Sequence, residues 1–464
     1  MKHIDIKGFF GSKAAQNIII LMTSIITIYF LISLYFVNHT FFRTSINGVD
    51  ISLKAHDEID SIIRSFIKDY KLQLIERNGE SEEITSQDIG MQYNEINSIS
   101  KVYKTESPLK WIFSLLWEHK WYVEDLFVYN REALESKINN LNCLNKNVIE
   151  PQNVSFKYSA GSYEVIKEIY GDKVHKDKLN KAIVRSILKG KIKIDLNENL
   201  CYENPKYTLN SDKTLETKNT LNKYISTKIT YTFGSKSETV DENIIHKWLR
   251  VDENLEVQIS LKAIKEYIQG LSKKYDTVGI ARKIKTSTGK TIDVGGGFYG
   301  WKIDRAAEII ALFENVKSGE MIAKEPVYSQ KALFREPDDI GNTYVEISIT
   351  RQYLWFYKDG KLIARGPVVT GNPSKGNATD TGIYMLNYKQ KGATLRGANY
   401  EAEVTYWMPF NGNIGMHDAS WRYSFGGDIY KRDGTHGCIN VPLNLAKKIF
   451  DNIEDGTPVI CYEE

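Results

Sequence analysis

The pattern of apolar and polar residues divides the chain into an apolar segment, a repeated middle part and a strand-rich end. Residues 18–37 are almost entirely apolar and carry no charge. At about 1.5 Å per residue, a helix of this length spans the roughly 30 Å hydrocarbon core of a bilayer. The run continues into Asn38-His39-Thr40 without the small residues of a signal-peptidase site. The pattern therefore predicts an uncleaved transmembrane helix over 18–37.

The charges on either side of this segment predict its orientation. Lys2, Lys7 and Lys13 precede it, whereas only Arg43 and the more distant Lys54 follow it closely. Because positive charge is retained on the cytoplasmic side, residues 1–17 are expected in the cytoplasm and the rest of the chain outside the cell. We therefore expect a single-pass protein of the cell membrane, with residues 38–69 as a juxtamembrane segment.

The middle of the chain contains an internal repeat. Tyr170-Gly171 and Tyr299-Gly300 each precede an amphipathic stretch that ends, at the same separation, at Gly190 or Gly319. A glycine at that place is the usual helix terminator. A strand–turn–strand pattern lies upstream of each (153–169 and 279–297), and a Pro-x-Tyr lies downstream (205–207 and 326–328). The repeat predicts two tandem α+β modules, at 70–207 and 228–328.

The end of the chain has the alternation of β-strands. A polar, turn-rich stretch at 335–342 is typical of a linker. Beyond it, alternating runs flank Asp359-Gly360, a strong hairpin signal, and one helical stretch lies at 442–453. We predict a mainly-β, β-sandwich-like domain at 343–463. The fold class is thus multidomain: one N-terminal transmembrane helix, two α+β repeat modules and a C-terminal mainly-β domain.

Composition removes several classes of protein. The chain has 464 residues, of which 42% are hydrophobic and 26% charged, enough for real cores and against a mostly disordered chain. Lys+Arg 61 against Asp+Glu 58 leaves a net charge of +3, too small to indicate a nucleic-acid partner. The four cysteines, Cys143, Cys201, Cys438 and Cys461, are too few and too far apart for a disulfide scaffold.

Candidate chemistry concentrates in the last domain, at Gly415-Met416-His417-Asp418 and at Thr435-His436-Gly437-Cys438-Ile439-Asn440. A cysteine in a turn before a helix near Pro442 has backbone N–H groups nearby that favour thiolate and can bind an oxyanion. A thiol near pKa 8.5 is largely protonated at neutral pH, so it benefits from an imidazole base. His417 and His436 are both candidates, and the sequence alone does not choose between them.

The remaining cysteines have plainer interpretations. Cys461 lies in an apolar strand and is expected in the core. Cys143 and Cys201 have no histidine neighbours and are interpreted as structural, with an extracellular disulfide between them as an alternative. A zinc site from His417, His436 and Cys438 would not match a common zinc module, so we predict no metal.

The two motifs together resemble the active-site signature of the L,D-transpeptidases with a YkuD-type catalytic domain. In that family a histidine precedes a variable loop and a Ser/Thr-His-Gly-Cys-x-Asn motif. The resemblance covers about the last 120 residues, including the stretch from Gly371 to Tyr384. The repeated modules resemble the peptidoglycan-binding-like modules of Gram-positive cell-wall proteins, which favours wall association over an inert stalk.

The resemblance implies a role for each motif residue. Cys438 would be the acylated nucleophile, His417 its base, and the backbone carbonyl of Asp418 would orient the imidazole. The N–H groups of Gly437 and Cys438 would form the oxyanion hole, and the site would be shaped for substrate by His436, Thr435 and Asn440. Many relatives have a small residue where this chain has Asp418, but the implied role belongs to the main chain.

The reaction implied by the family is formation of 3→3 peptidoglycan cross-links through a Cys438 thioester, with release of D-alanine. The partners would be a tetrapeptide stem as donor and a stem-peptide amine as acceptor, without a cofactor. With water as acceptor, the enzyme would be an L,D-carboxypeptidase. A non-catalytic wall-binding protein and a sortase-like transpeptidase are the rival hypotheses, although no arginine follows Cys438 as in sortases. Residues 389–404 would form either a lid over the site or an ordinary exposed hairpin.

Overall fold

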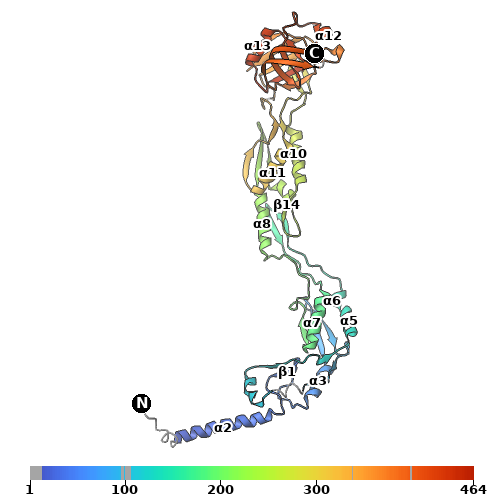
Figure 1. The fold of residues 1–464 in the computed structure, drawn as a ribbon, viewed down its shortest axis with the longest axis vertical. Coiled ribbons are helices and arrows are strands. Elements are labelled where there is room, and N and C mark those ends of the chain that lie inside the picture. The colour runs from blue at the N-terminus through green and yellow to red at the C-terminus, as the bar shows by residue number, and fades with distance from the viewer. Residues whose placement is uncertain (1–12, 96–98, 100–105, 337, 398–399) are drawn as a thin grey trace, which may run out of the picture. The chain divides into compact units, whose positions relative to one another are not determined.

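The computed structural model describes residues 13–95, 99, 106–336, 338–397 and 400–464 (Figure 1). The chain forms two compact units. The first runs to Ser155 and resumes over Ile166–Ser211, and the second comprises Phe156–Val165 and Asp212–Glu464. The predicted cytoplasmic segment 1–17 lies mostly outside the described residues, as do its lysines Lys2 and Lys7.

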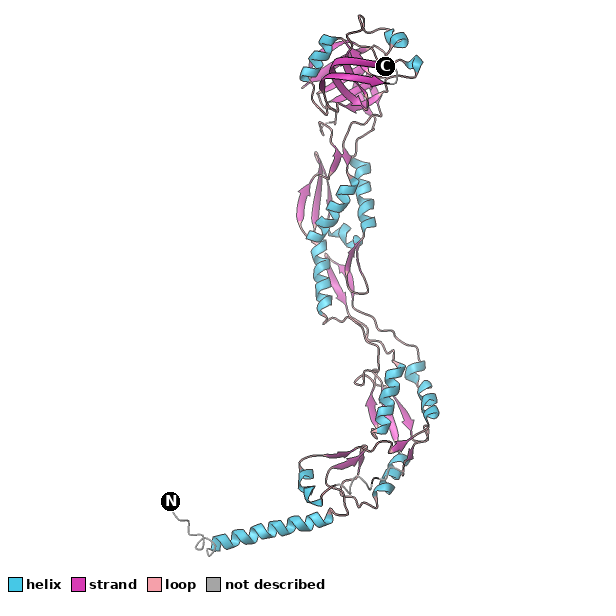
Figure 2. Ribbon diagram, in the orientation of Figure 1, coloured by secondary structure: helices cyan, strands magenta, loops and turns pink. Residues whose placement is uncertain are grey.

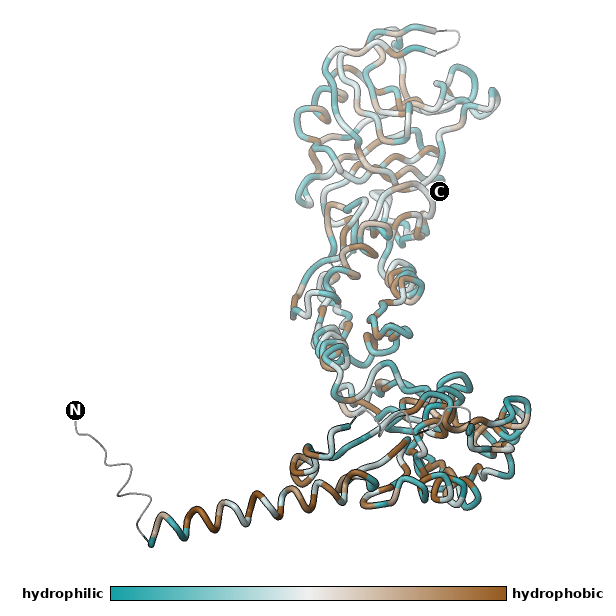
Figure 3. Tube along the Cα trace, turned by 60° about the horizontal axis from the view of Figure 1, so that its bottom comes forward, coloured by the Kyte–Doolittle hydropathy of each residue, from teal (hydrophilic) through white to brown (hydrophobic). Residues whose placement is uncertain are grey.

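The apolar segment forms helix α2 (Lys13–Tyr35). By length and composition it could cross a membrane, with a mean hydropathy of 2.3 over its most apolar window, of which 6% is buried. It is the one such helix in the described part of the chain, and most of its length is brown in Figure 3. The structure thus confirms one candidate N-terminal apolar helix.

The first unit is built around a three-stranded sheet. Its strands are β3 (Lys71–Ile75), β4 (Ser81–Thr85) and β10 (Lys193–Asp195), in the order β10-β3-β4 with β10 parallel to β3. Alternation along β3 buries Leu72 and Leu74, and the apolar stripe of α7 (Lys176–Leu188) belongs to the same core. Its other elements are β1 (Thr44–Ile46), β2 (Val49–Asp50), α3 (Ile59–Lys68), β5 (Gln92–Tyr93), η1 (Pro108–Leu115), β6 (His119–Trp121), β7 (Phe127–Val128), α5 (Arg131–Asn139) and α6 (Asn142–Asn145).

The same order of elements recurs in the second unit, which confirms the tandem α+β repeat. Strands β11 (Lys228–Phe233) and β12 (Lys236–Val240) form a hairpin, and β18 (Met321–Lys324) follows a helix to pair parallel with β11. That helix is α11 (Arg305–Ser318), which ends at Gly319 in the left-handed conformation, as predicted. Each sheet is preceded by a helix, α3 or α8 (Asp212–Ile225). The module also contains α9 (Glu242–Ile245), η2 (His246–Trp248), β13 (Leu249–Val251), β14 (Val257–Ile259), α10 (Leu261–Tyr275), β17 (Lys302–Ile303) and β19 (Tyr328–Gln330).

The two predicted strand–turn–strand patterns form hairpins, but each packs on the domain that follows it in sequence. Residues of β8 (Ser155–Ser159) and β9 (Ser162–Ile166), with Tyr163 buried, belong to the core of the second repeat. The hairpin of β15 (Arg282–Lys285) and β16 (Thr291–Val294) instead joins a core with Ile383, Ile460 and Tyr462 of the C-terminal domain. An isolated hairpin cannot bury its apolar face alone, so it needs a neighbouring core.

The C-terminal domain consists of two sheets. Its strands are the magenta arrows near the C-terminus in Figure 2. The first has the order β22-β21-β20-β28-β23 and the second β24-β25-β26-β27, with helix α13 (Leu443–Asn452) packed on the shared core. Cys461 lies fully buried in β28. The strands are β20 (Tyr344–Ser348), β21 (Tyr353–Lys358), β22 (Lys361–Pro367), β23 (Gly382–Met385), β24 (Gln390–Gly397), β25 (Tyr400–Asn411), β26 (Ile414–Asp418), β27 (Ile439–Val441) and β28 (Pro458–Tyr462), with the short helices η3 (Pro373–Lys375) and α12 (Ile429–Asp433). The predicted strand-rich domain is confirmed.

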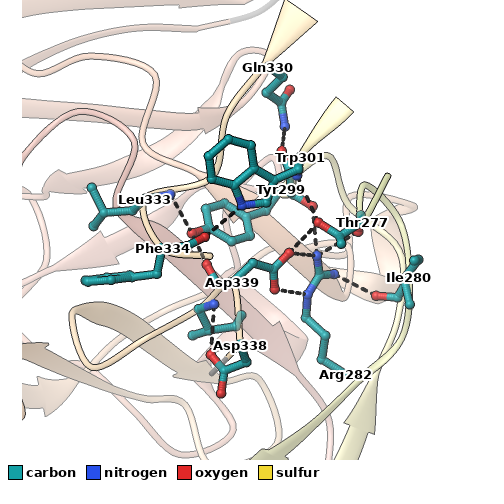
Figure 4. A network of polar contacts seen from close by, with 12 residues as sticks. Thr277, Ile280, Arg282, Tyr299, Trp301, Gln330, Leu333, Phe334, Asp338 and Asp339 are labelled. Atoms are coloured by element: carbon teal, nitrogen blue, oxygen red, sulfur yellow. Dashed lines mark hydrogen bonds and ion pairs between the residues drawn. The ribbon is translucent and has the colours of Figure 1, made fainter. Parts of the chain in front are cut away.

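The stretch 335–342 connects the second repeat to this domain, but it is not a free linker. Asp339 is buried and its carboxylate pairs with the guanidinium of Arg282 at 2.6 and 2.7 Å (Figure 4). The indole N–H of Trp301 donates to the carbonyl of Phe334 at 2.7 Å. The polar composition that suggests a linker here serves a buried network that joins the two parts.

Candidate active site

Two neighbouring strands bring the predicted motifs together. Strands β26 and β27 pair in parallel, with Met416 opposite Ile439 and His417 opposite Asn440. Because side chains alternate along a strand, Cys438, two residues before Asn440, is on the same side of the sheet as His417. All three residues line one cavity of about 600 Å³.

His417 is held in a defined orientation. Its Nδ1 lies 2.8 Å from the main-chain oxygen of Asp418. A carbonyl only accepts, so Nδ1 carries the proton and Nε2 of the neutral ring is left as a base. Burial lowers the pKa of His417 below its ordinary value, and the positive charge of Arg422 adds to that effect, whereas the hydrogen bond to the Asp418 carbonyl opposes it. The rings of Trp407 and Trp421 lie 5.8 and 6.0 Å from the imidazole. The arrangement therefore favours a neutral imidazole.

The side chain of Asp418 has a separate use. Its carboxylate accepts hydrogen bonds from the backbone N–H groups of Thr405, at 2.8 and 3.1 Å, and Tyr406, at 2.7 Å. It is almost fully buried. The carboxylate therefore fixes β25 to β26 next to the imidazole, which a small residue at this position could not do. The sequence contained no signal for this contact.

Cys438 presents its sulfur to the cavity among backbone groups. Its Sγ lies 3.7 Å from the carbonyl oxygen of Asn413. Burial raises the pKa of the Cys438 thiol above its ordinary value, and a hydrogen bond from the backbone N–H of Gly415 opposes this. Such a group is a thiol at neutral pH and needs a base to become a nucleophile.

The turn before Cys438 is closed by Thr435. The threonine hydroxyl donates to the carbonyl of Cys438 at 2.6 Å and accepts from the N–H of Gly437 at 3.0 Å. Gly437 has φ +116°, and a Cβ there would lie 2.9 Å from the side chain of Ile414, so only glycine suits the position. The N–H of Gly437, predicted as an oxyanion donor, is thus already bonded. It could serve an oxyanion only once Thr435 releases it.

The stretch from Gly371 to Tyr384 lies beside this turn. The preceding Val369 exchanges two 2.9 Å backbone hydrogen bonds with Asn440, and the N–H of Asn372 donates to the carbonyl of Thr435 at 3.0 Å. The hydroxyl of Thr379 donates to the carbonyl of Gly437 at 2.8 Å. Through these hydrogen bonds, the stretch holds the backbone on either side of Cys438 in place.

Further residues line the cavity that were not predicted from the sequence. Arg422 lines it with a side chain that is 9% exposed, and its guanidinium donates to Asp433 at 2.9 Å. Its buried Nε has no hydrogen-bond partner among the described residues. The only available signal was its position one residue after Trp421. Exposed His436 also borders the cavity, as do Lys375, Leu395, Glu401, Ala402, Glu403 and Gly434.

The stretch 389–404, predicted as a lid or an ordinary hairpin, forms the hairpin of β24 and β25. Leu395, Glu401, Ala402 and Glu403 of this hairpin face the cavity, and its tip at 398–399 lies outside the described residues. Within the described ranges, no group of three or more His, Cys, Asp or Glu side chains is placed to hold a metal ion. Cys143 and Cys201 are buried free thiols.

Comparison with known proteins agrees with this architecture. Residues 342–461 match the model of the L,D-transpeptidase catalytic domain (YkuD). Residues 82–195 and 209–321 each match the model described as "Putative peptidoglycan binding domain". A search of curated proteins gives no match.

Several solved structures are similar to the chain. A mutant of the Enterococcus faecium L,D-transpeptidase is 30% identical, over 54% of this chain and 100% of that one, with a TM-score of 0.45. The avibactam carbamoyl enzyme Ldtfm has the same identity and TM-score, over 54% of this chain and 99% of that one. The catalytic domain of the E. faecium enzyme, solved by NMR, is 39% identical over 26% of this chain and 97% of that one, with a TM-score of 0.25.

A strand-rich domain with a cysteine and a histidine in one cavity, preceded by two wall-binding-type modules, defines a class of cell-wall enzymes. On the family models and the sequence identity over the whole length of a relative, this chain belongs to the L,D-transpeptidases. These matches support a transpeptidase role with peptidoglycan as the substrate.

Proposed function

We propose that this protein is a membrane-anchored L,D-transpeptidase that forms 3→3 cross-links in peptidoglycan through a thioester on Cys438. The observation that carries the proposal is the pairing of β26 with β27. It puts His417, with Nδ1 bound to the Asp418 carbonyl, and Cys438 on one side of the sheet and in one cavity.

Acylation of the enzyme would begin with transfer of the thiol proton to Nε2 of His417. The sulfur then attacks the carbonyl that joins the third stem residue to the terminal D-alanine, which forms a C–S bond and a tetrahedral oxyanion. Collapse of this intermediate breaks the C–N bond. His417 returns its proton to the leaving amine, and D-alanine departs.

The second half of the reaction regenerates the thiol. The amine of another stem attacks the thioester carbonyl and gives up a proton to His417, the C–S bond breaks, and the sulfur recovers that proton. With a stem amine the product is a 3→3 cross-link. Water in the same place would yield a tripeptide, so the same residues could perform carboxypeptidase chemistry.

Stabilisation of the oxyanion is assigned to backbone amides next to the sulfur. The N–H of Cys438 is the first proposed donor, and that of Gly437 the second, after its bond to the Thr435 hydroxyl opens. Asn440 and His436 border the same cavity and are proposed to contact the donor stem. In this scheme Thr435 controls when the second amide becomes available.

The location proposed for this reaction is the outer side of the cell membrane. Helix α2 is proposed as a single-pass anchor with the N-terminus in the cytoplasm, on the basis of its length, composition and flanking lysines. The two repeated modules, proposed at 70–207 and 228–328, would bind wall polymer between the anchor and the catalytic domain proposed at 343–463.

The test is to incubate the full chain with disaccharide-tetrapeptide and to resolve the products by mass. We expect dimers that have lost one D-alanine, with tripeptide as the product of hydrolysis, and neither from Cys438→Ala. Because a solved E. faecium catalytic domain is acylated by ertapenem, ertapenem should add its mass to Cys438 of this chain. A folded chain that gives neither turnover nor an adduct would refute the proposal in favour of a wall-binding protein.

A further inference from the structure

The first unit exposes a short apolar segment next to α2. Residues 108–117 contain η1 and carry a single charge, on Lys110. Six of the ten side chains are large, apolar and between 44% and 69% exposed: Leu109, Ile112, Phe113, Leu115, Leu116 and Trp117. Isolated exposed apolar residues are ordinary, but a contiguous group of this kind indicates a surface that meets something other than water.

The segment is docked on α2 rather than free. The ring of Trp111 is buried and packs against Tyr29 and Phe36 of the helix region, at centroid distances of 5.8 and 5.9 Å. Its indole N–H donates to the hydroxyl of Ser33 at 3.1 Å. The hydroxyl of Tyr29 donates to the carbonyl of Leu109. The segment is thus fixed to the helix through Trp111 and the carbonyl of Leu109, while the six apolar side chains stay exposed.

The contact points set the depth of the segment. Tyr29, Ser33 and Phe36 lie eight, four and one residues before Val37, the end of the apolar run. At about 1.5 Å per residue, these positions are roughly 12, 6 and 1.5 Å from that end along the helix. If α2 spans the bilayer as proposed, a segment bound at these residues is level with the outer part of the hydrocarbon core.

The polar groups at this contact are paired as a lipid environment requires. Ser33 donates to the carbonyl of Tyr29 at 2.8 Å, and it accepts from Trp111. Within the segment, the N–H groups of Leu116 and Trp117 both donate to the carbonyl of Phe113, at 3.1 and 3.0 Å. Backbone and hydroxyl groups without partners are costly in hydrocarbon, and these have partners. The long side chain of Lys110 can reach the headgroups.

A second observation also indicates contact with lipid. An apolar cavity of about 480 Å³ opens beside the same turns of α2, between Ile28 and Phe36 of the helix region and the side chains of Phe42 and Leu53. It is continuous with a helix whose exposed surface is suited to lipid, and its walls are almost wholly apolar. An acyl chain of the outer leaflet suits the apolar lining of this cavity.

We infer that residues 108–117 insert into the outer leaflet beside α2, so that the first unit meets the bilayer through two elements instead of one. The inference rests on the proposed anchor, and it goes beyond the proposed enzymatic function. A single helix lets the attached unit pivot freely, whereas a second buried contact fixes which side of the unit faces the membrane.

The test uses the full chain in phospholipid nanodiscs, with Cys438→Ser so that an introduced cysteine is the accessible thiol, since Cys143, Cys201 and Cys461 are buried. A nitroxide is placed by Phe113→Cys or by Leu116→Cys. Collision of the label with oxygen, which concentrates in lipid, is compared with collision with a water-soluble nickel chelate. Two control sites are Ile25→Cys in α2 and Ile149→Cys, which replaces an exposed apolar residue (56%) of the same unit outside the segment.

We expect the labels at 113 and 116 to favour oxygen as the label at 25 does, and the label at 149 to favour nickel. Nickel-favoured labels at 113 and 116 beside an oxygen-favoured label at 25 would overturn the inference and leave the anchor intact. Labels shielded from both reagents would mean that protein covers the segment, which also overturns it. A nickel-favoured label at 25 would instead refute the anchor itself.

Discussion

The imidazole Nδ1 of His417 lies 2.8 Å from the main-chain carbonyl of Asp418, the next residue in β26. Because the strand backbone itself orients the ring, the side chain at 418 is free for another contact. Its carboxylate uses that freedom to accept the N–H groups of Thr405 and Tyr406. One residue thus orients the proposed base with its main chain and secures the neighbouring strand with its side chain.

The two parts of Asp418 can be separated by substitution. Asp418→Ala would leave two buried amides without an acceptor, at a cost of about 1–3 kcal/mol each in free energy of unfolding. Asp418→Asn retains a carbonyl oxygen and should lose less. Urea unfolding of the full chain measures both. Equal stability of the alanine variant and the native chain would show that the carboxylate contacts do not matter.

The choice between the two histidines is a second prediction. His417→Ala should lower the rate of Cys438 acylation by about 10²–10⁴-fold, the usual contribution of a positioned general base. His436→Ala should act mainly on KM, since this exposed residue borders the cavity. Mass spectrometry of ertapenem adducts over time measures the rate of Cys438 acylation in each variant. A larger loss of rate in the His436 variant would transfer the role of base to that residue.

The pH dependence of thiol reactivity follows from the two pKa shifts. The pKa of Cys438 is raised above 9.0 by burial, and that of His417 is lowered below 6.5 by burial. The resting pair is therefore a thiol and a neutral imidazole. Alkylation of Cys438 by iodoacetamide should rise only as the pH approaches and passes 9. A plateau of reactivity around pH 6–8 would instead indicate a thiolate–imidazolium pair.

The same shift of His417 predicts a change in stability. The unfolded chain binds a proton at His417 at a higher pH than the folded chain does, since the folded pKa is below 6.5. The contribution of the neutral ring to the free energy of unfolding is complete above pH 6.5 and is lost as the pH falls through the folded pKa. Urea unfolding should show a smaller loss of stability on acidification for His417→Gln than for the native chain.

Arg422 is predicted to select anionic donors. A buried guanidinium with one unpaired nitrogen, at the wall of the cavity, favours a carboxylate of the stem peptide. Arg422→Gln should raise KM for the donor with a smaller change in kcat, and less so for a donor with a C-terminal amide if the terminal carboxylate is the one bound. Asp433→Asn, which releases the guanidinium, is the matched control and should lower KM. An unchanged KM in both variants would dismiss this role.

The buried pair of Arg282 and Asp339 is predicted to hold the second repeat to the catalytic domain. Asp339→Ala leaves the guanidinium buried without its partner and should cost about 3–5 kcal/mol in free energy of unfolding. Lys283→Ala is the control, because its pair with Asp293 is exposed, with side chains 79% and 65% accessible, and should cost about 0–1 kcal/mol. Thermal unfolding of the full chain measures both variants. Equal stability of Asp339→Ala and Lys283→Ala would show that the buried pair does not stabilise the protein.

The sequence by itself determined the features that depend on neighbouring residues. An uncharged run predicts α2, and the repeated Tyr-Gly landmarks with their terminal glycines predict α7 and α11. The order of residues around Cys438 indicated the family that the comparisons show. Such patterns are local because helix periodicity, strand alternation and turn chemistry act over a few residues.

Tertiary structure alone decided the contacts between distant residues. The parallel register of β26 and β27 brings His417 beside the Cys438 motif, and folding back of Asp339 turns an apparent linker into a buried joint. The hairpin of β15 and β16 packs on the next domain, a choice that its own alternation does not encode. Hydrophobic burial is non-directional, so it does not specify which distant segments of the chain pack together. Strand pairing, packing neighbours and the hydrogen bond between Thr435 and the Gly437 N–H therefore depend on the tertiary structure.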